Sequence, residues 1–437
     1  MTRTLTLAAA LLMTATPGFA HDLPDDLKSS IQADYDRKLG DLFVHFHENP
    51  ELSFREIETS KRIASELEAL GYDVDTGVGK TGVVAVLKNG SGPTVMVRAD
   101  MDGLPVKEDS GLPYQSTARQ TNIVGKEFPV MHACGHDVHI TSLIGTAKQM
   151  MDRREAWSGT LVLIAQPAEE IISGAKAMIE DGLYRKYPKP DYALAFHVTS
   201  QLPTGKVVVP KGLAYSSSDS IDITVRGVGA HGASPHMGID PVLVASAIVV
   251  NLQSIVSRTI APLQPGVITV GSIHGGTKHN IIGDRVDLQL TVRSDDPEVR
   301  TKLLDGIDRV VAGTAAAYGV PDDLMPIVTR LPQNTPPTKN DADTAGYLDT
   351  VLRDHLGEDT LINPPRQGMG AEDFAEFVAP EHGVKGVYMA VGGTPPGDLD
   401  TAASHHSPFF KVDPEPSVTL GTEAMVVSAM SLFARGE

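Results

Sequence analysis

Apolar and polar residues in the first half of the chain alternate in blocks that predict helices and strands in alternation. Residues 28–71 carry apolar side chains at helical spacing, and Gly71 ends that pattern as a C-terminal glycine does. Short apolar runs and helical stretches then alternate, which favours an α/β fold with a mixed, largely parallel sheet and helices on both faces. In such sheets ligands bind beyond the carboxyl ends of the strands. The predicted strands cover residues 83–87, 94–98, 160–165 and 192–196, and the predicted helices cover residues 140–151 and 175–180.

The pattern changes in the middle of the chain and predicts an inserted second domain. Four strands and two helices follow one another there in the order β-α-β-β-α-β, which is the ferredoxin-like unit. We therefore place the second domain at residues 213–328 and the main domain at residues 21–212 and 329–437. The proline-rich residues 332–337 fit the linker that returns to the main domain. The predicted elements of the second domain are strands 220–226, 266–273, 285–293 and 325–329 and helices 241–258 and 297–318; helix 342–356, strand 386–391 and helix 417–433 then complete the main domain.

The first twenty residues have the layout of a secretory signal peptide. Arg3 supplies a positive charge, residues 5–13 are apolar, and residues 17–20 give a small-residue cleavage site before His21. The apolar run is shorter than the roughly 20 residues that span a bilayer. We therefore expect residues 1–20 to be removed, with an uncleaved anchor or a terminus that is apolar by chance as the alternatives. The mature protein is expected to be secreted, into the periplasm of a bacterium, and to have no membrane partner.

Length, charge and cysteine usage narrow the function classes. A chain of 437 residues suits two or three domains. The formal net charge of −18 argues against a nucleic-acid partner, because binding to phosphates needs clustered lysine and arginine. Cys134 is the single cysteine, so an intramolecular disulfide is excluded. It is expected either to be buried as a small apolar residue or to be protected as a metal ligand.

Cys134 and His136 form the first cluster with candidate chemistry. They lie two residues apart in the histidine-rich residues 132–139. If that segment is extended, both side chains project to the same side and could bind one metal ion. The alternatives are a structural zinc half-site and a loop that is rich in histidine by chance.

Three further clusters carry side chains that can bind metals. Glu169 and Glu170 follow the predicted strand 160–165, and adjacent carboxylates in an extended segment point in different directions. One could therefore bind a metal while the other acts as a base on water, although a solvated acidic loop would show the same pair. His197 follows the predicted strand 192–196, and His406 belongs to the doublet with residue 405. A lone histidine is more often a hydrogen-bonded structural residue than a ligand.

Taken together and in order, these clusters resemble the M20 metallopeptidases. The resemblance is to the branch of hippurate hydrolases, N-acyl-amino-acid amidohydrolases and auxin-conjugate hydrolases, and it covers nearly the whole chain after residue 20. The motifs that carry it are His-Glu-Asn-Pro-Glu-Leu at 47–52, Arg-Ala-Asp-Met-Asp-Gly-Leu-Pro at 98–105, the cysteine cluster at 131–139, Glu-Glu at 169–170, His-Gly-Ala-Ser-Pro-His at 231–236, Met-Gly-Ala-Glu-Asp-Phe at 369–374 and His-Ser-Pro-Phe at 406–409.

The resemblance implies a role for each matching residue of the main domain, which becomes a metal-binding catalytic domain. It implies that Glu169 is the general base and that Asp102 orients a metal ligand, as the outer partners of metal ligands do. The cofactor implied is a pair of divalent metal ions per subunit, with manganese or zinc ahead of cobalt or nickel. The implied ligands of the two ions are Cys134, His136, Glu170, His197 and His406.

The resemblance also gives the second domain a role, as a lid and dimerisation domain of a homodimer. Within it, His231 resembles the histidine that stabilises the oxyanion and that in many family members reaches the partner subunit's site. Asn280 and Arg293 lie where family members hold the carboxylate of the substrate. The implied reaction is hydrolysis of the amide bond of a small N-acyl amino acid or dipeptide by a metal-activated water.

Departures from the family pattern leave alternatives open. Ala371 replaces the usual serine, and Gly283 ends a segment that usually ends in proline. These changes put the substrate preference in doubt more than the catalysis. The doublet of His405 and His406 leaves the last ligand open to a shift of one residue, and we choose His406 because it directly precedes Ser-Pro. A metallo-dipeptidase or carboxypeptidase is the alternative enzyme, and an exported metal- or peptide-binding protein or an assembly protein is the alternative without catalysis.

Overall fold

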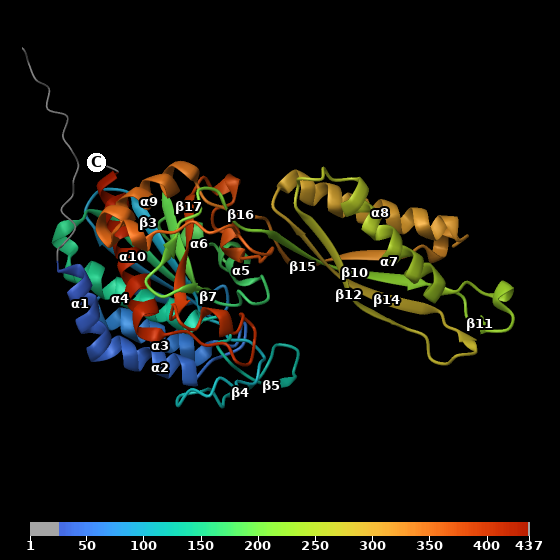
Figure 1. The fold of residues 1–437 in the computed structure, drawn as a ribbon, viewed down its shortest axis with the longest axis horizontal. Helices are drawn as coiled ribbons and strands as arrows, with labels where there is room; N and C mark the ends of the chain where they lie inside the picture. Colours follow the sequence, from blue (N-terminus) through green and yellow to red (C-terminus); the bar gives the residue numbers. More distant parts are fainter. Residues whose placement is uncertain (1–25, 436–437) are drawn as a thin grey trace, which may run out of the picture.

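The computed structural model describes residues 26–435, which form two bodies (Figure 1). The predicted signal peptide, residues 1–20, and the predicted cleavage before His21 lie outside the described residues. The larger body contains both ends of the described chain and the central sheet (Figure 1). The smaller body is built from the middle of the chain, and the chain enters and leaves it through two neighbouring strands.

The larger body is built on a seven-stranded mixed sheet, which confirms the predicted α/β class. The order across the sheet is β1-β2-β6-β3-β7-β17-β8. The central pairs β6–β3, β3–β7 and β7–β17 are parallel, and the outer pairs are antiparallel. Each predicted strand of this body overlaps an observed one because buried strands appear in the sequence as apolar runs. The strands are β1 (Asp73–Val78), β2 (Gly82–Asn89), β3 (Thr94–Asp100), β6 (Gly159–Gln166), β7 (Tyr192–Pro203), β8 (Val207–Val208) and β17 (Lys385–Thr394).

Helices cover both faces of this sheet, as predicted. Alternate side chains of a strand point to opposite faces, and β3 shows the consequence. Val95 and Val97 pack into the core under the larger group of helices, whereas Met96 packs into the core on the other face. The first face carries α1 (Leu27–Asp34), α2 (Gly40–Glu48), α3 (Ile57–Ala69), α4 (His136–Asp152), α9 (Ala342–Leu356) and α10 (Pro414–Arg435), and the second carries α5 (Gly174–Glu180) and α6 (Leu183–Lys186).

Residues 28–71, which the periodicity predicts to be helical, contain three α-helices and a break between the second and the third. A π-helical turn, η1 (Tyr35–Leu39), joins α1 to α2, and residues 49–56 are not helical. Pro50 explains the break, since proline lacks a backbone N–H and disfavours the helical conformation in the residue before it. Asn49 accordingly leaves the helix with φ −126°.

The smaller body pairs two long helices with a four-stranded antiparallel sheet. The strand order is β12-β14-β10-β15, and the order along the chain is β-α-β-β-α-β. Asp240 and Asp296 each accept hydrogen bonds from two backbone N–H groups at a helix start, and a proline follows each of them. The domain boundaries and the role as a lid and dimerisation domain stay predictions. The elements are β10 (Ser217–Arg226), α7 (Pro241–Arg258), β12 (Gly266–Gly275), β14 (Arg285–Ser294), α8 (Pro297–Ala317), β15 (Ile327–Thr335) and the small pair β11 (Ala230–His231) and β13 (Ile281–Ile282).

The predicted return linker, residues 332–337, is partly strand, because β15 continues to Thr335. Pro332 is tolerated there since the pairing with β10 shifts register between Asp219 and Ile221. A bulge removes the need for a ladder hydrogen bond at the proline.

Within residues 26–435, two helices have the length and apolar composition of a membrane span, namely α7 and α10. In α10, 83% of the apolar stretch is buried inside the larger body, as expected for a core helix of a domain. The remaining short elements are β4 (Arg119–Thr121), β5 (Glu127–Pro129), β9 (Leu213–Tyr215), β16 (Thr338–Lys339) and the 3₁₀ turns η2 (Arg154–Ala156), η3 (Pro235–Met237), η4 (Asp322–Leu324), η5 (Glu358–Thr360), η6 (Asp373–Glu376), η7 (Pro380–His382) and η8 (Leu399–Thr401).

Candidate metal centre

The metal-capable side chains gather at the carboxyl ends of the central parallel strands. β3 ends at Asp100, and Glu169 and Glu170 follow the end of β6. The prediction that His197 closes its strand is wrong, because β7 continues to Pro203. The pairing of β7 with β3 nevertheless ends at the residue pair 98 and 195, so His197 lies two residues beyond the last paired residue of its strand. The start of α4 and the loop before residue 410 complete the cluster.

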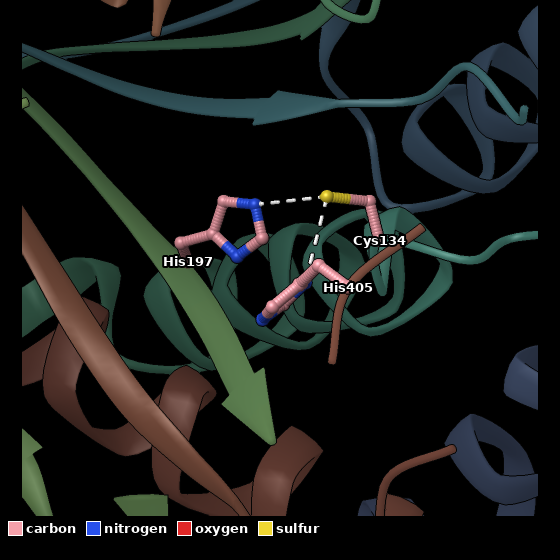
Figure 2. Close-up of side chains that lie close together, drawn as sticks. All are labelled: Cys134, His197 and His405. Atoms are coloured by element: carbon pink, nitrogen blue, oxygen red, sulfur yellow. Dashed lines mark hydrogen bonds between the residues drawn. The ribbon is translucent and has the colours of Figure 1, made fainter. Parts of the chain in front are cut away.

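Cys134 lies at the centre of the cluster and takes part in two groups of possible ligands. Its Sγ is 3.5 Å from Nε2 of His197 and 3.6 Å from Nδ1 of His405 (Figure 2). Cys134 also lies close to Glu170 and His406, in a group whose ligand atoms are all within 4.8 Å of one another. A thiolate shared by two groups could bind two ions.

The second half of the cluster is centred on Glu170. One of its carboxylate oxygens, Oε1, is 3.8 Å from Nε2 of His136, and Oε2 is 3.3 Å from Nε2 of His406. All five predicted ligands are therefore brought together. His405 reaches the cluster as well, since the backbone of His406 adopts a left-handed φ of 65° and both neighbouring rings face the site. The choice of His406 as the ligand stays a prediction.

Two polar atoms of the cluster indicate that the residues fit a metal. Nε2 of His136 and Oε1 of Glu170 are buried and have no hydrogen-bond partner within residues 26–435. Leaving such atoms unpaired costs about 1–3 kcal/mol each. Burial, together with Asp102 and Asp100, raises the pKa of Glu170 to about 8, although His136 lowers it. Divalent cations would satisfy both atoms and offset the concentrated negative charge.

Asp102 connects the two halves of the cluster through its hydrogen bonds. Its carboxylate accepts the backbone N–H of Glu169 at 3.0 Å and that of Glu170 at 3.1 Å. The Ser53 hydroxyl donates to the same carboxylate at 2.6 Å. The backbone carbonyl of Asp102 lies 2.8 Å from Nδ1 of His136, which places the proton on Nδ1 and leaves Nε2 free as a ligand atom.

Asp100 and His139 also lie in the cluster, although the sequence analysis assigned no role to either residue. Nδ1 of His139 is 2.5 Å from Asp100, and its Nε2 accepts the backbone N–H of Val198 at 2.8 Å. Because both ring nitrogens are used, His139 holds β7 and its His197 in place. Both residues belong to motifs quoted above, but only the tertiary contacts separate this role from that of a ligand.

A buried arginine, Arg98, forms hydrogen bonds with the side chains that support the site, and these side chains and Arg98 are called the floor of the site. Arg98 donates to Asp100 at 2.7 Å, to Gln166 at 2.8 Å and to Glu372 at 2.7 Å. The hydroxyl of Tyr388 donates to Glu372 at 2.5 Å. Glu372 lies close to the predicted base, in a buried group with Glu169 and residue 373. Sequence reasoning missed this network because its members come from four separate segments of the chain.

Gly135 sets the direction in which α4 leaves the cluster, and we expect Gly135→Ala to be strongly destabilising. Gly135 has φ 83°, and a Cβ there would lie 2.4 Å from Cγ1 of Val198. The left-handed backbone and the clash together are expected to cost about 2–4 kcal/mol of unfolding free energy and to lower metal binding. Gly125→Ala is the matched control, because Gly125 has the same φ of 83° with open space around it, so about 1 kcal/mol is expected. Denaturant unfolding and metal analysis check both; equal losses in the two variants would contradict the packing argument.

The three predicted residues of the second body are not all at the cavity. Arg293 lines it from β14, half-buried, and its Nε donates to Thr291 at 3.2 Å. His231 and Asn280 are exposed and lie near the small pair β11–β13, at the far end of the smaller body (Figure 1). The structure therefore does not bring these two to the cavity of their own chain, and their roles stay predictions.

The cavity that opens onto the cluster has a volume of about 1400 Å³. Cys134, Glu169, Glu170 and His197 lie at one part of its wall. Segments 210–215 and 363–372 form much of the remaining wall, with both apolar and polar side chains. A cavity of this kind, with a few converging polar groups, is typical of a site for a small molecule.

Comparisons with known proteins find similar chains over most of this sequence. The family model described as peptidase family M20/M25/M40 matches residues 96–430. The chain is 36% identical over 423 residues to thermostable carboxypeptidase 2 of Saccharolobus solfataricus, covering 94% of this chain and 98% of that one. It is 40% identical over 335 residues to hippurate hydrolase of Campylobacter jejuni, covering 76% and 82% of the two chains. The solved YxeP protein of Bacillus subtilis, described as a dinuclear metal-binding peptidase of the M20 family, matches with a TM-score of 0.73 and 28% identity, over 93% of this chain and 99% of that one.

Proposed function

The chain belongs to peptidase family M20/M25/M40, and we propose that it is a two-metal amidohydrolase that cleaves the amide bond of N-acyl amino acids. The observation that carries the proposal is the cluster around Cys134 and Glu170, with the carboxylate of Glu169 beside it at the wall of the cavity. Binding alone would need the ligands, but it would not need a second buried carboxylate next to them.

The two ions would be held by the five predicted ligands, namely Cys134, His136, Glu170, His197 and His406. When bound, divalent ions would lower the pKa of a water molecule and polarise the scissile carbonyl. Thiolate and imidazole ligands favour zinc, whereas carboxylates also suit manganese. We propose that one of these two metals is the natural one, with cobalt or nickel as the alternatives.

Glu169 acts as the general base and then as the general acid. Its carboxylate accepts a proton from the attacking water, whose oxygen adds to the amide carbonyl carbon. The carbon–nitrogen bond then breaks, and Glu169 returns the proton to the departing amine nitrogen. Glu169 is 6% exposed, and a hydrogen bond from its backbone N–H to the carboxylate of Asp102 fixes its position.

Arg293 is one of three cationic residues that line the cavity, with Lys211 and Arg366, and we propose that it binds the carboxylate of an amino-acid product. Burial lowers the pKa of its guanidinium, so an anionic partner would stabilise the charged form. The predicted partner at this carboxylate, Asn280, and the predicted oxyanion donor, His231, would have to come from a partner subunit. We therefore propose a homodimer, in line with the exposed position of both residues. We also propose that the protein is secreted into a periplasm, on the strength of residues 1–20.

Hydrolysis assays test this function directly. The protein starting at His21 is loaded with manganese or with zinc and is offered N-acetyl, N-benzoyl and indole-acetyl amino acids. We expect cleavage that falls to background with a chelator and returns when the metal is added. The reason is that the bound divalent ions would supply the positive charge that activates the water. Cleavage that is indifferent to the chelator would rule the proposal out.

A carboxypeptidase or dipeptidase is the second candidate. The similarity to a carboxypeptidase over 94% of the chain favours it, and the chemistry of the site is the same. Simple dipeptides in the same assay distinguish the two, since only the pocket that holds the acyl group differs between them.

A further inference from the structure

A strained turn carries the two glutamates of the site. Residues 168–173 follow β6, and the backbone N–H of Ile172 donates to the carbonyl of Glu169 at 2.7 Å. The N–H groups of residues 173 and 174 both donate to the carbonyl of Ala168, each at 3.2 Å. Closing the chain this tightly places Ala168 at φ 51° and Ile172 at φ 50°.

Ile172 is an unfavourable residue for that conformation. The left-handed region is rare for residues other than glycine, and a β-branched side chain there is a true outlier. Glycine would make the same turn without this cost. Strain of this kind persists at functional sites, where the side chain has a use that offsets it.

Ile172 lines the cavity, as do Glu169 and Glu170. Its neighbour Ile171 is also half-buried but does not line the cavity, and Ala168 is fully buried. The cavity volume of about 1400 Å³ exceeds that of most small-molecule sites, which are about 300–1000 Å³. The overall cavity is therefore too roomy to select by size, and selection needs a local wall at the reacting centre.

We propose that Ile172 determines specificity by narrowing the cavity beside the base. The enzyme then prefers substrates that are slim at the atoms next to the scissile amide, such as N-acetyl over N-benzoyl amino acids. This inference rests on the proposed function, which it makes more specific. Ile172 is not assigned a part in the chemistry itself.

The test compares kcat/KM for the N-acetyl and N-benzoyl derivatives of one amino acid in three variants. Ile172→Ala and Ile172→Gly both remove the wall, so the ratio is expected to shift toward the benzoyl substrate by about 10-fold or more. Ile171→Gly is the matched control and is expected to keep the ratio of the unchanged protein. An unaltered ratio in both Ile172 variants overturns the inference, and so does an equal shift in the Ile171 control.

Two further readouts separate this inference from the proposed function. If the unchanged protein cleaves dipeptides but no N-acyl amino acid, the proposed function fails. The ratio for Gly-Leu against Phe-Leu then decides the role of Ile172 in the same way. Thermal unfolding tests the strain: Ile172→Gly is expected to melt above Ile171→Gly, since only the former relieves a left-handed residue. The reverse order would contradict the strain argument.

Discussion

Glu169→Gln is expected to lower kcat by about 10²- to 10⁴-fold while leaving two metals bound per chain. Glutamine has nearly the same shape as glutamate but cannot accept the proton of the attacking water. The turn should stay in place, because it is held by the backbone N–H of Glu169, which donates to Asp102. The loss should therefore appear in kcat at saturating substrate, with metal content measured on the same sample.

Glu170→Gln is the matched control for that variant, since the two residues are adjacent and the change is the same. Glu170 faces both His136 and His406, so its amide is expected to reduce metal binding before it affects the chemistry. Glu169→Gln should therefore keep the metals without turnover, whereas Glu170→Gln should lose the metals. A Glu169→Gln protein that turns over at the normal rate would refute the assignment of the base.

Five strands of the larger body could be predicted because they are largely buried and read as apolar runs, namely β2, β3, β6, β7 and β17. β1 could not, since this edge strand pairs with β2 alone and is largely exposed, so its sequence Asp-Val-Asp-Thr-Gly-Val resembles a loop. The helical character of residues 28–71 could be predicted, but periodicity does not register the break at Pro50. β15 shows the opposite error. The sequence around Pro332 indicates a linker, but a bulge accommodates this proline within the strand.

The candidate ligands could be found in the sequence because their order along the chain resembles that of a known family, and all of them except His197 belong to a quoted motif. Their supporting residues could not be ranked, since the same motifs contain ligands and supports side by side. His139 illustrates the limit: it lies three residues from His136, yet its ring nitrogens bind Asp100 and the backbone of Val198. The functional difference between two histidines of one helix turn is decided by contacts with distant strands.

Arg98→Met is expected to lower the unfolding free energy by about 3–5 kcal/mol, the largest stability effect among our predictions. Arg98 is buried and donates to Asp100 and Glu372, with Asp373 at 3.5 Å. Methionine fills much of the same volume but leaves these carboxylates buried without their cation. Burial alone would raise the pKa of Asp100, and it is Arg98 that holds that pKa well below its usual range. Denaturant unfolding of the metal-free protein isolates this effect from metal binding.

Two controls show whether the effect comes from an uncompensated buried charge. Arg98→Lys keeps the charge but not the planar fork of donors, so an intermediate loss is expected. Arg285→Met removes an arginine whose partner, Asp287, is also exposed, and it should change stability by no more than about 0.5 kcal/mol. Asp100 in turn binds His139, which holds β7 beside His197. Arg98→Met is therefore expected to weaken metal binding too, although Arg98 is not itself a ligand. If Arg98→Met unfolds at the same denaturant concentration as Arg285→Met, the buried network does not hold the floor of the site.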